Sequence, residues 1–270
     1  MNPQTPTVSI IIPARNEARN LEMVLPELPA VHQVVLIDGH SVDDTIETAK
    51  RLMPDILVVQ QTRSGKGNAL TCGFAAATGD IIVMFDADGS ADPAEIPAFV
   101  QALIDGADVA KGSRFARGGG SDDITGFRSL GNRGLNLLTN LLLRSKYTDL
   151  CYGYNAFWRR VVPTLGLPDH IKSAEEGAMI WGDGFEIETL LNCRFFLRGH
   201  RIVEVPSIER SRIYGTSNLN AIRDGMRVLR TILAERGRTI VALPSTHVHD
   251  VMGVAHVEAN GDGDDIRKAA

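Results

Sequence analysis

Apolar and polar positions follow two alternating patterns over the first 115 residues. Short runs rich in Val and Ile, such as VSIIIP at residues 8–13, alternate with segments in which apolar residues recur every three or four positions. The runs predict buried strands and the longer segments predict amphipathic helices. We expect strands at residues 8–13, 32–39, 56–61, 80–89 and 107–114, and helices at 16–28, 41–53, 65–79 and 93–106. Such alternation with short connections predicts an α/β fold, a mostly parallel sheet with helices on both faces.

The pattern changes after residue 116. A glycine-rich loop is expected at residues 117–126, followed by helices at 127–146, 182–199 and 218–237 and a strand at 200–210. We predict one domain over residues 1–238, with a first half at 7–115 and a second half at 116–238. Periodicity fades beyond it, so residues 239–270 are expected to form a flexible acidic tail. A leucine stripe in the helix at 127–146 (Leu130, Leu135, Leu138, Leu142) either packs in the core or faces lipid or a partner.

Composition narrows the classes of partner. The chain has 270 residues and a formal net charge of −5, which gives no reason to expect nucleic acid as the main partner. Its three cysteines are far apart, which favours a reducing compartment over a disulfide framework or a zinc site. The polar N-terminus and the absence of an apolar run of ~18 residues predict a cytoplasmic protein with at most peripheral membrane contact. Basic residues gather at 111–160 and 194–238, as solvated helix faces or as the site of an anionic ligand.

Polar side chains stand where the predicted strands end. The strand at 80–89 runs into Asp86 and Asp88, and carboxylates are costly to bury unless a cation meets them. Such a pair either closes a polar turn or holds a divalent metal through oxygen ligands. Arg15 and Asp38 also follow buried strands. The carboxyl ends of parallel strands share one edge of a sheet, where ligands bind, so these positions together favour a binding site.

Five segments in order, SIIIPARNE, LIDGHSVDDT, SGKGNAL, DADGSADP and EVPSIERSRIYGTSNL, resemble successive motifs of the family 2 glycosyltransferases with the GT-A fold. Within that family the chain is most similar to the polyprenyl-phosphate (dolichyl-phosphate) mannosyl- and glucosyltransferases, from about Val8 to Arg230. The resemblance implies transfer of a hexose from a nucleotide-sugar to polyprenyl phosphate, with inversion and with Mg²⁺ or Mn²⁺ as cofactor. A peripheral contact with the inner face of the membrane would go with that acceptor.

The resemblance also implies roles for individual residues. Asp86 and Asp88 would hold the metal, which stabilises charge on the departing diphosphate, with Asp88 as the direct ligand. The other implied donor-binding residues are Pro13, Ala14, Arg15, Glu17, Asp38 and Lys66. Guanidinium groups suit phosphate oxygens, and those implied for the acceptor phosphate are Arg117, Arg128 and Arg212, with Arg128 also counted as catalytic. The sugar-pocket candidates are Asp149 and Asn155. Glu188, in GDGFEIE, is expected beneath the site as a buried partner.

The identity of the donor stays open at this point. Many bacterial relatives read D-A-D-L-Q where this chain has Gly89 and Ser90 after the second aspartate. That difference and GKGNAL lean toward the glucosyltransferases, whereas ITGFR and VPSIERSRIYGTSN lean toward the mannosyltransferases. Both UDP-glucose and GDP-mannose are therefore considered, with a slight preference for UDP-glucose.

The identity of the acceptor also stays open. A lipid phosphate is already anionic and can attack without a strong base, whereas a hydroxyl group needs a carboxylate to take its proton. Asp183 stands where hydroxyl-using members of the wider family place that base. The arginines favour polyprenyl phosphate, and the alternative is a hydroxyl acceptor (a polysaccharide or a natural product) with Asp183 as catalytic base. A nucleotide-sugar-binding protein without catalysis is a third interpretation, which the intact Asp86 and Asp88 disfavour.

Overall fold

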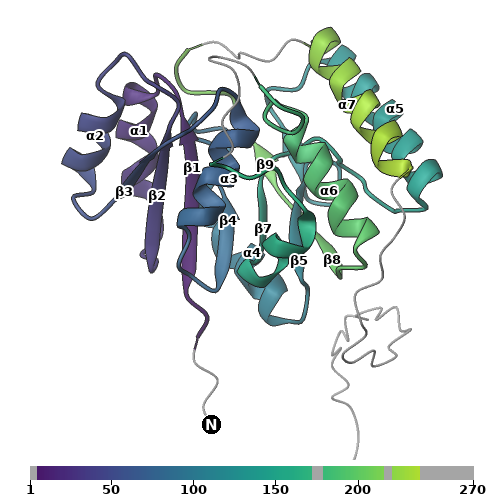
Figure 1. Ribbon diagram of the computed structural model, residues 1–270, viewed down its shortest axis with the longest axis horizontal. Helices are drawn as coiled ribbons and strands as arrows, with labels where there is room; N and C mark the ends of the chain where they lie inside the picture. Colours follow the sequence, from purple (N-terminus) through teal and green to yellow (C-terminus); the bar gives the residue numbers. More distant parts are fainter. Residues whose placement is uncertain (1–4, 172–178, 216–220, 238–270) are drawn as a thin grey trace, which may run out of the picture.

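The computed structural model describes residues 5–171, 179–215 and 221–237. A seven-stranded sheet has the order β3-β2-β1-β4-β7-β5-β8 (Figure 1). Its strands are β1 (Val8–Ala14), β2 (Gln33–Asp38), β3 (Leu57–Gln60), β4 (Ile81–Met84), β5 (Val109–Ser113), β7 (Asn155–Trp158) and β8 (Ile202–Pro206). Neighbouring strands pair in parallel except where β7 runs antiparallel between β4 and β5. The predicted mostly parallel α/β sheet is confirmed, and the predicted tail lies outside the described residues.

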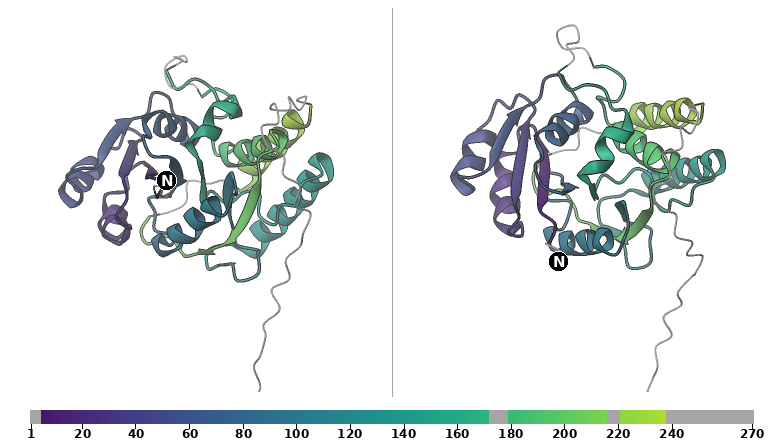
Figure 2. Two further views of the ribbon diagram at one scale, coloured as in Figure 1. Left: turned by 90° about the horizontal axis from the view of Figure 1, so that it is seen from below. Right: turned by 60° about the horizontal axis from the view of Figure 1, so that its bottom comes forward.

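Helices cover both faces of this sheet (Figures 1 and 2). They are α1 (Ala18–Val24), α2 (Thr45–Leu52), α3 (Lys66–Ala76), α4 (Ile96–Ile104), α5 (Gly126–Leu143), α6 (Ile187–Leu197) and α7 (Ala221–Arg236). Shorter elements are η1 (Leu25–Glu27), η2 (Pro93–Glu95), η3 (Arg159–Leu165) and the paired strands β6 (Gly120–Ser121) and β9 (Ile208–Glu209). Helices α1, α2 and α4 pack on one face, and α3 and α6 pack on the other.

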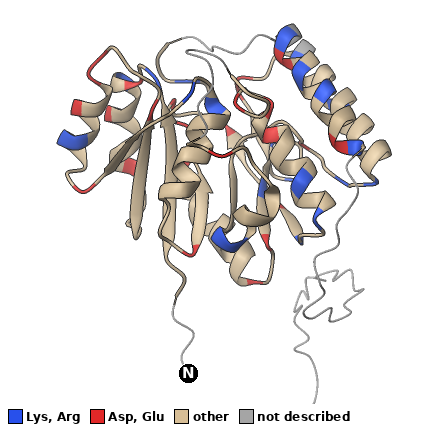
Figure 3. Ribbon diagram, viewed as in Figure 1, with Lys and Arg blue, Asp and Glu red and all other residues tan. Residues whose placement is uncertain are grey.

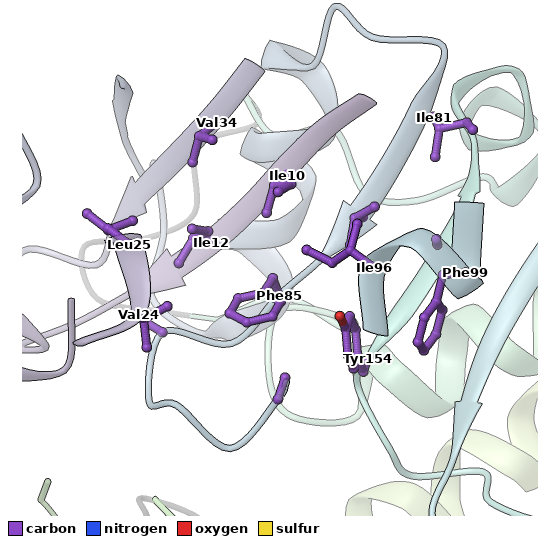
Figure 4. Close-up of a cluster of buried hydrophobic side chains, with 14 of the residues drawn as sticks. Ile10, Ile12, Val24, Leu25, Val34, Ile81, Phe85, Ile96, Phe99 and Tyr154 are labelled. Atoms are coloured by element: carbon purple, nitrogen blue, oxygen red, sulfur yellow. The ribbon is translucent and has the colours of Figure 1, made fainter. Parts of the chain in front are cut away.

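The alternation of side chains in β1 explains why the strand is apolar throughout. Ile10 and Ile12 belong to the cluster packed with α1 and α4, whereas Ile11 belongs to the cluster on the α3 side. Figure 4 shows Ile10 and Ile12 beside Val34 and Phe85 in the first cluster. Burying one such side chain contributes about 1.5–3 kcal/mol. Two apolar faces therefore hold β1 rigidly in the centre of the sheet.

Strand β7 was not predicted, because NAFW is only four residues long and lies inside a segment rich in aromatic and basic residues. It pairs with both β4 and β5 and so separates them in the sheet. The residues just before it, Cys151, Tyr152 and Gly153, consequently reach the carboxyl edge near the end of β4, where they line the cleft described below.

The leucine stripe of α5 divides between core and surface. Leu135, Leu138 and Leu142 pack against a third apolar cluster that α5, α6 and α7 share. On the other face of the helix, Leu130, Leu137 and Leu141 are 72%, 62% and 69% exposed. Helices α5 and α7 lie side by side at one end of the molecule (Figure 1). Core packing thus explains three of the four predicted leucines, and Leu130 belongs to a separate exposed face.

Candidate active site

A cleft of about 1100 Å³ opens at the carboxyl edge of the sheet. Parallel pairing brings the ends of β1 and β2 together, with Ala14 opposite Asp38, and the loop after β4 lies beside them. Nine of the predicted site residues line this cleft: Pro13, Ala14, Arg15, Glu17, Lys66, Asp86, Asp88, Arg128 and Arg212. Residues as far apart in the chain as Pro13 and Arg212 thus meet at one edge, as expected for parallel strands.

Asp86 is held by Lys66 from the first turn of α3. The Lys66 Nζ atom lies 2.7 Å from Asp86 Oδ1 and 2.6 Å from Glu188 Oε1. Burial alone lowers the pKa of Lys66, but the charges of Asp86 and Glu188 outweigh it and raise that pKa above its ordinary value. Burial also raises the pKa of Glu188, against the opposing charge of Lys66. Lys66 is therefore a permanently charged bridge between two carboxylates.

Lys66 is positioned by close packing of the backbone. The Gly67 N–H donates to the Asp183 carbonyl oxygen at 2.7 Å. A Cβ atom at Gly67 would overlap the carbonyl oxygen of Gly182, so no larger residue fits. The G-K-G motif therefore lets the segment before α6 lie directly against the start of α3.

Asp88 is held by a second cation, Arg212. Arg212 Nη2 lies 2.9 Å from Asp88 Oδ2, and Nη1 lies 2.9 Å from Glu17 Oε1. Burial lowers the pKa of Arg212, but Asp88 and Glu17 more than compensate, so its pKa is raised. The other Asp88 oxygen, Oδ1, accepts hydrogen bonds from Ser90 N at 3.0 Å and Ser90 Oγ at 2.7 Å. Each aspartate of the D-A-D motif therefore shares a basic residue with a glutamate.

Gly89 follows Asp88 for a local reason. Its φ is +79°, and a Cβ atom there would overlap Cδ1 of Ile213. The main chain near Ile213 is bonded to this loop, since Ile213 N donates to Asp88 O at 3.1 Å and Arg210 N donates to Ser90 O at 2.8 Å. The glycine in place of the leucine of D-A-D-L-Q thus lets the segment that carries Arg212 pack on the D-A-D loop.

The carboxylates of the cleft suit a divalent cation whose coordination is completed by a bound ligand. Four carboxylates (Glu17, Asp86, Asp88, Glu188) face two cations (Lys66, Arg212), which leaves two negative charges in excess when all are ionised. Among the described residues no group of three or more His, Cys, Asp or Glu could hold a metal by itself. Mg²⁺ is commonly bound by one or two carboxylates together with substrate phosphates. Asp86 and Asp88 fit that mode of binding.

Two further arginines, Arg128 and Arg114, also line the cleft. Arg128 lies in the first turn of α5, where Thr125 caps the helix, and its Nη1 is 3.0 Å from Asp123 Oδ2. Arg114 was not among the site residues predicted from the sequence, although it follows β5 at the same sheet edge. It pairs with Asp149 and Glu209. Burial lowers the pKa of Arg114, but the two carboxylates raise it above its ordinary value.

The structure corrects the prediction for Asp183. Both carboxylate oxygens accept hydrogen bonds from Arg63, at 2.8 and 2.9 Å, and the side chains of this pair are 1% and 2% exposed. Among the described residues that line the cleft, Asp183 is absent. Because its oxygens are turned into the protein, this carboxylate is not placed to take a proton from an acceptor.

Four further predicted residues also lie outside the lining that the described residues form. Asp149 is fully buried against Arg114, and Asn155 lies inside β7, where both polar side-chain atoms are buried without a described partner. Asp38 is 1% exposed and accepts from Ser41 N at 3.2 Å. Arg117 is exposed in the loop after β5. The sugar-pocket assignments, the base contact of Asp38 and the phosphate contact of Arg117 are therefore not supported by position.

Two comparisons of sequence place this site in a family. A model of glycosyl transferase family 2 matches residues 9–166. The dolichol-phosphate mannosyltransferase of Pyrococcus furiosus is 30% identical over 224 residues, which cover 78% of this chain and 59% of that protein. An uncharacterized glycosyltransferase of Mycobacterium tuberculosis is 37% identical over 107 residues, 40% of this chain and 48% of that protein. This chain thus spans about half the length of these curated relatives.

Solved structures share the fold. Glucosyl-3-phosphoglycerate synthase from Mycobacterium tuberculosis, in complex with Mn²⁺, UDP and glucosyl-3-phosphoglycerate, superposes with a TM-score of 0.65 at 23% identity. The match covers 89% of this chain and 82% of that one. The predicted resemblance is confirmed: the chain has the GT-A fold and belongs to family 2 of the glycosyltransferases.

Proposed function

We propose that this chain is an inverting glycosyltransferase that moves a hexose from UDP-glucose or GDP-mannose to polyprenyl phosphate, with Mg²⁺ or Mn²⁺. The observation that carries the proposal is the pair of carboxylates, Asp86 and Asp88, at the edge of a GT-A sheet with two negative charges in excess. A divalent cation bound there supplies Lewis-acid stabilisation of the departing diphosphate.

The remaining donor contacts come from the ends of β1 and β3. Pro13, Ala14 and Arg15 line the cleft beside Asp86, as does Gln61 directly after β3. Lys66 adds a positive charge that burial between two carboxylates keeps fixed. Preorganised charge of this kind stabilises developing negative charge without reorganisation during the reaction. These residues would hold the nucleoside and orient the diphosphate.

The acceptor assignment depends on the basic side of the cleft. Arg128 and Arg212 both line it, and guanidinium forks match phosphate oxygens in two-point contacts. A phosphate nucleophile is ionised at neutral pH and needs no general base. The ion pair between Asp183 and Arg63 agrees with a phosphate acceptor, because it occupies the carboxylate that would otherwise be the candidate base. The relative from Pyrococcus furiosus is named for transfer to dolichol phosphate.

A lipid acceptor also gives a role to the exposed face of α5. Leu130, Leu137 and Leu141 project from the helix that begins beside the cleft at Arg128, and Figure 3 shows basic residues along the neighbouring α7. An exposed apolar stripe on one helix and basic residues on its neighbour suit peripheral contact with an anionic membrane surface. In the described residues no helix is both long and apolar enough to cross a membrane.

A hydroxyl acceptor is the second candidate, with Glu188 in place of Asp183. Glu188 lines the cleft, and burial raises its pKa, which brings a carboxylate closer to the range suited to a general base. The glucosyl-3-phosphoglycerate synthase that shares this fold was solved with a phosphorylated product. A phosphorylated acceptor could use the same arginines.

Transfer of radiolabelled sugar separates these candidates. UDP-glucose and GDP-mannose are each incubated with the protein, Mn²⁺ or Mg²⁺, and either a short polyprenyl phosphate or 3-phosphoglycerate. We expect label in the lipid phase with one donor, and its loss when EDTA is added. Label only in a water-soluble product of 3-phosphoglycerate would favour the second candidate. Binding of nucleotide-sugar without transfer to either compound would contradict both polyprenyl phosphate and 3-phosphoglycerate as acceptors.

A further inference from the structure

The two oxygens of Asp88 have different partners. Oδ1 accepts two hydrogen bonds from Ser90, in the same loop. Oδ2 lies 2.9 Å from Arg212 Nη2, which comes from a segment more than 120 residues later. Breaking the Ser90 contacts would disturb the turn that shapes the loop. A cation that coordinates Asp88 would therefore take Oδ2, the oxygen that Arg212 contacts.

The main chain around Arg212 is fixed, but its side chain has room to move. Arg210 N and Ile213 N donate to the carbonyls of Ser90 and Asp88, and Tyr214 N donates to Asn20 Oδ1 at 2.9 Å. Arg212 itself lines the cleft, and 22% of its side chain is exposed. An exchange of partners at Asp88 thus requires a new rotamer of Arg212, which also holds Glu17 through Nη1 at 2.9 Å, and no movement of the main chain.

We propose that Arg212 and the divalent cation exclude one another at Asp88 Oδ2, and that the displaced guanidinium turns to a phosphate group in the cleft. The contact between Arg212 and a phosphate group rests on the proposed function. The competition between Arg212 and the cation does not. A cation alone must break the Arg212 contact, whereas a nucleoside diphosphate offers that arginine a new anionic partner. Cation and diphosphate therefore bind cooperatively, and Arg212 couples them.

Thermodynamic linkage predicts the direction in which removal of Arg212 changes the affinity for the cation, and this change can be measured. If Arg212 competes with the cation, its removal strengthens binding of the cation alone. If Arg212 also contacts the diphosphate, its removal weakens the mutual enhancement between cation and nucleotide, which must be equal in both directions. A residue that only braced the loop would instead weaken cation binding in every condition.

The test is a Mn²⁺ titration without nucleotide, followed by the electron paramagnetic resonance of free Mn²⁺. We expect Arg212→Ala and Arg212→Met to bind Mn²⁺ at least about fivefold more tightly than the wild type, the lower end of common coupling factors. The matched control is Arg210→Ala, because Arg210 lies in the same segment and pairs with Asp92 outside the D-A-D motif. Its Mn²⁺ affinity should equal that of the wild type.

Two further titrations assign the effect. In an Asp88→Asn background, Arg212→Ala should no longer change Mn²⁺ binding, since the carboxylate for which Arg212 and the cation compete is gone. With saturating UDP or GDP, the advantage of Arg212→Ala should shrink or reverse. Unchanged or weaker binding of Mn²⁺ alone by both Arg212 variants overturns the inference. A failure of sugar transfer to polyprenyl phosphate, with the Mn²⁺ result intact, would instead remove only the proposed acceptor.

Discussion

Two layers of ion pairs lie at the carboxyl edge of the sheet, and they differ in what their carboxylates can still bind. In the lower layer, Arg63 with Asp183 and Arg114 with Asp149 form two-point contacts, and none of these side chains is more than 6% exposed. In the cleft layer, Lys66 with Asp86 and Arg212 with Asp88 are between 15% and 36% exposed. Of these four carboxylates, Asp86 and Asp88 line the cleft and can offer oxygens to a ligand, whereas Asp183 and Asp149 are not in its described lining.

The difference has an energetic counterpart. Removing one partner of a buried ion pair typically costs about 3–5 kcal/mol, because the other charge is left buried and unpaired. Pairs that water reaches contribute about 0–1 kcal/mol. Substitutions in the lower layer should therefore reduce stability, and substitutions in the cleft layer should reduce turnover. Each of the following predictions tests that separation.

Asp88→Asn should have the largest effect, on turnover. The amide keeps the size of the carboxylate but loses the charge that a divalent cation requires. We expect sugar transfer to fall about 1000-fold, or roughly 4 kcal/mol of transition-state stabilisation, while the free energy of unfolding changes by less than about 1 kcal/mol. Initial rates at saturating Mn²⁺ and urea unfolding measure the two quantities. A variant that turns over like the wild type would remove the metal assignment.

Asp183→Asn should behave in the opposite way. The substitution removes the negative charge from the two-point contact that Asp183 makes with the buried Arg63 guanidinium, which is 2% exposed, and we expect a loss of about 3–4 kcal/mol in the free energy of unfolding. Transfer per folded molecule should stay within about fivefold of the wild type. Urea unfolding and rates measured below the unfolding transition test this. A stable protein with abolished transfer would instead return Asp183 to the role of catalytic base.

Asp149→Asn should cost somewhat less and should depend on pH. Arg114 keeps Glu209 as a second partner, so we expect a loss of about 2–3 kcal/mol at pH 7. Burial alone raises the pKa of Asp149, but its contacts with Arg114 lower it below the ordinary value of 3.8. The wild-type carboxylate therefore contributes stability above that pH and loses it as the pH falls further.

The measurement is urea unfolding of wild type and Asp149→Asn between pH 7 and pH 3. The difference in unfolding free energy should be constant at neutral pH and should narrow in acid, where the wild type is protonated. A difference that grows toward acid would mean that the pKa of Asp149 is raised in the folded protein. Asp149 would then not belong to the lower layer, whose carboxylates are stabilised by a buried arginine.

The sequence predicts the edge of the sheet well because local pattern determines it. The runs at β1, β2 and β4 are apolar on both faces, and the motifs that follow them reach the cleft as expected. The sequence does not predict that Asp183 and Asp149 are buried. Each of these carboxylates pairs with an arginine that only the tertiary fold brings beside it. Arg63 lies 120 residues before Asp183. Asn155 lies outside the described cleft lining for a related reason, since the antiparallel strand that buries it shows no alternating pattern in the sequence.

The smallest predicted effect concerns Arg128, which is proposed to contact the acceptor. Arg128 lines the cleft and Arg117 does not, although both are basic residues of one loop-to-helix region. Arg128→Ala should raise the KM for the acceptor about tenfold, near 1.4 kcal/mol, with little change in the KM for the donor. Arg117→Ala is the matched control and should leave both KM values within about twofold.

Steady-state kinetics with each substrate varied in turn makes this measurement. The comparison of acceptor and donor is needed because the Arg128 guanidinium also contacts Asp123, and a general loosening of the start of α5 would raise both KM values together. Equal increases for the two substrates would make Arg128 a structural residue. An effect of Arg117→Ala as large as that of Arg128→Ala would mean that the acceptor phosphate reaches beyond the cleft. A place in the cleft lining would then not by itself identify the residues that bind the acceptor.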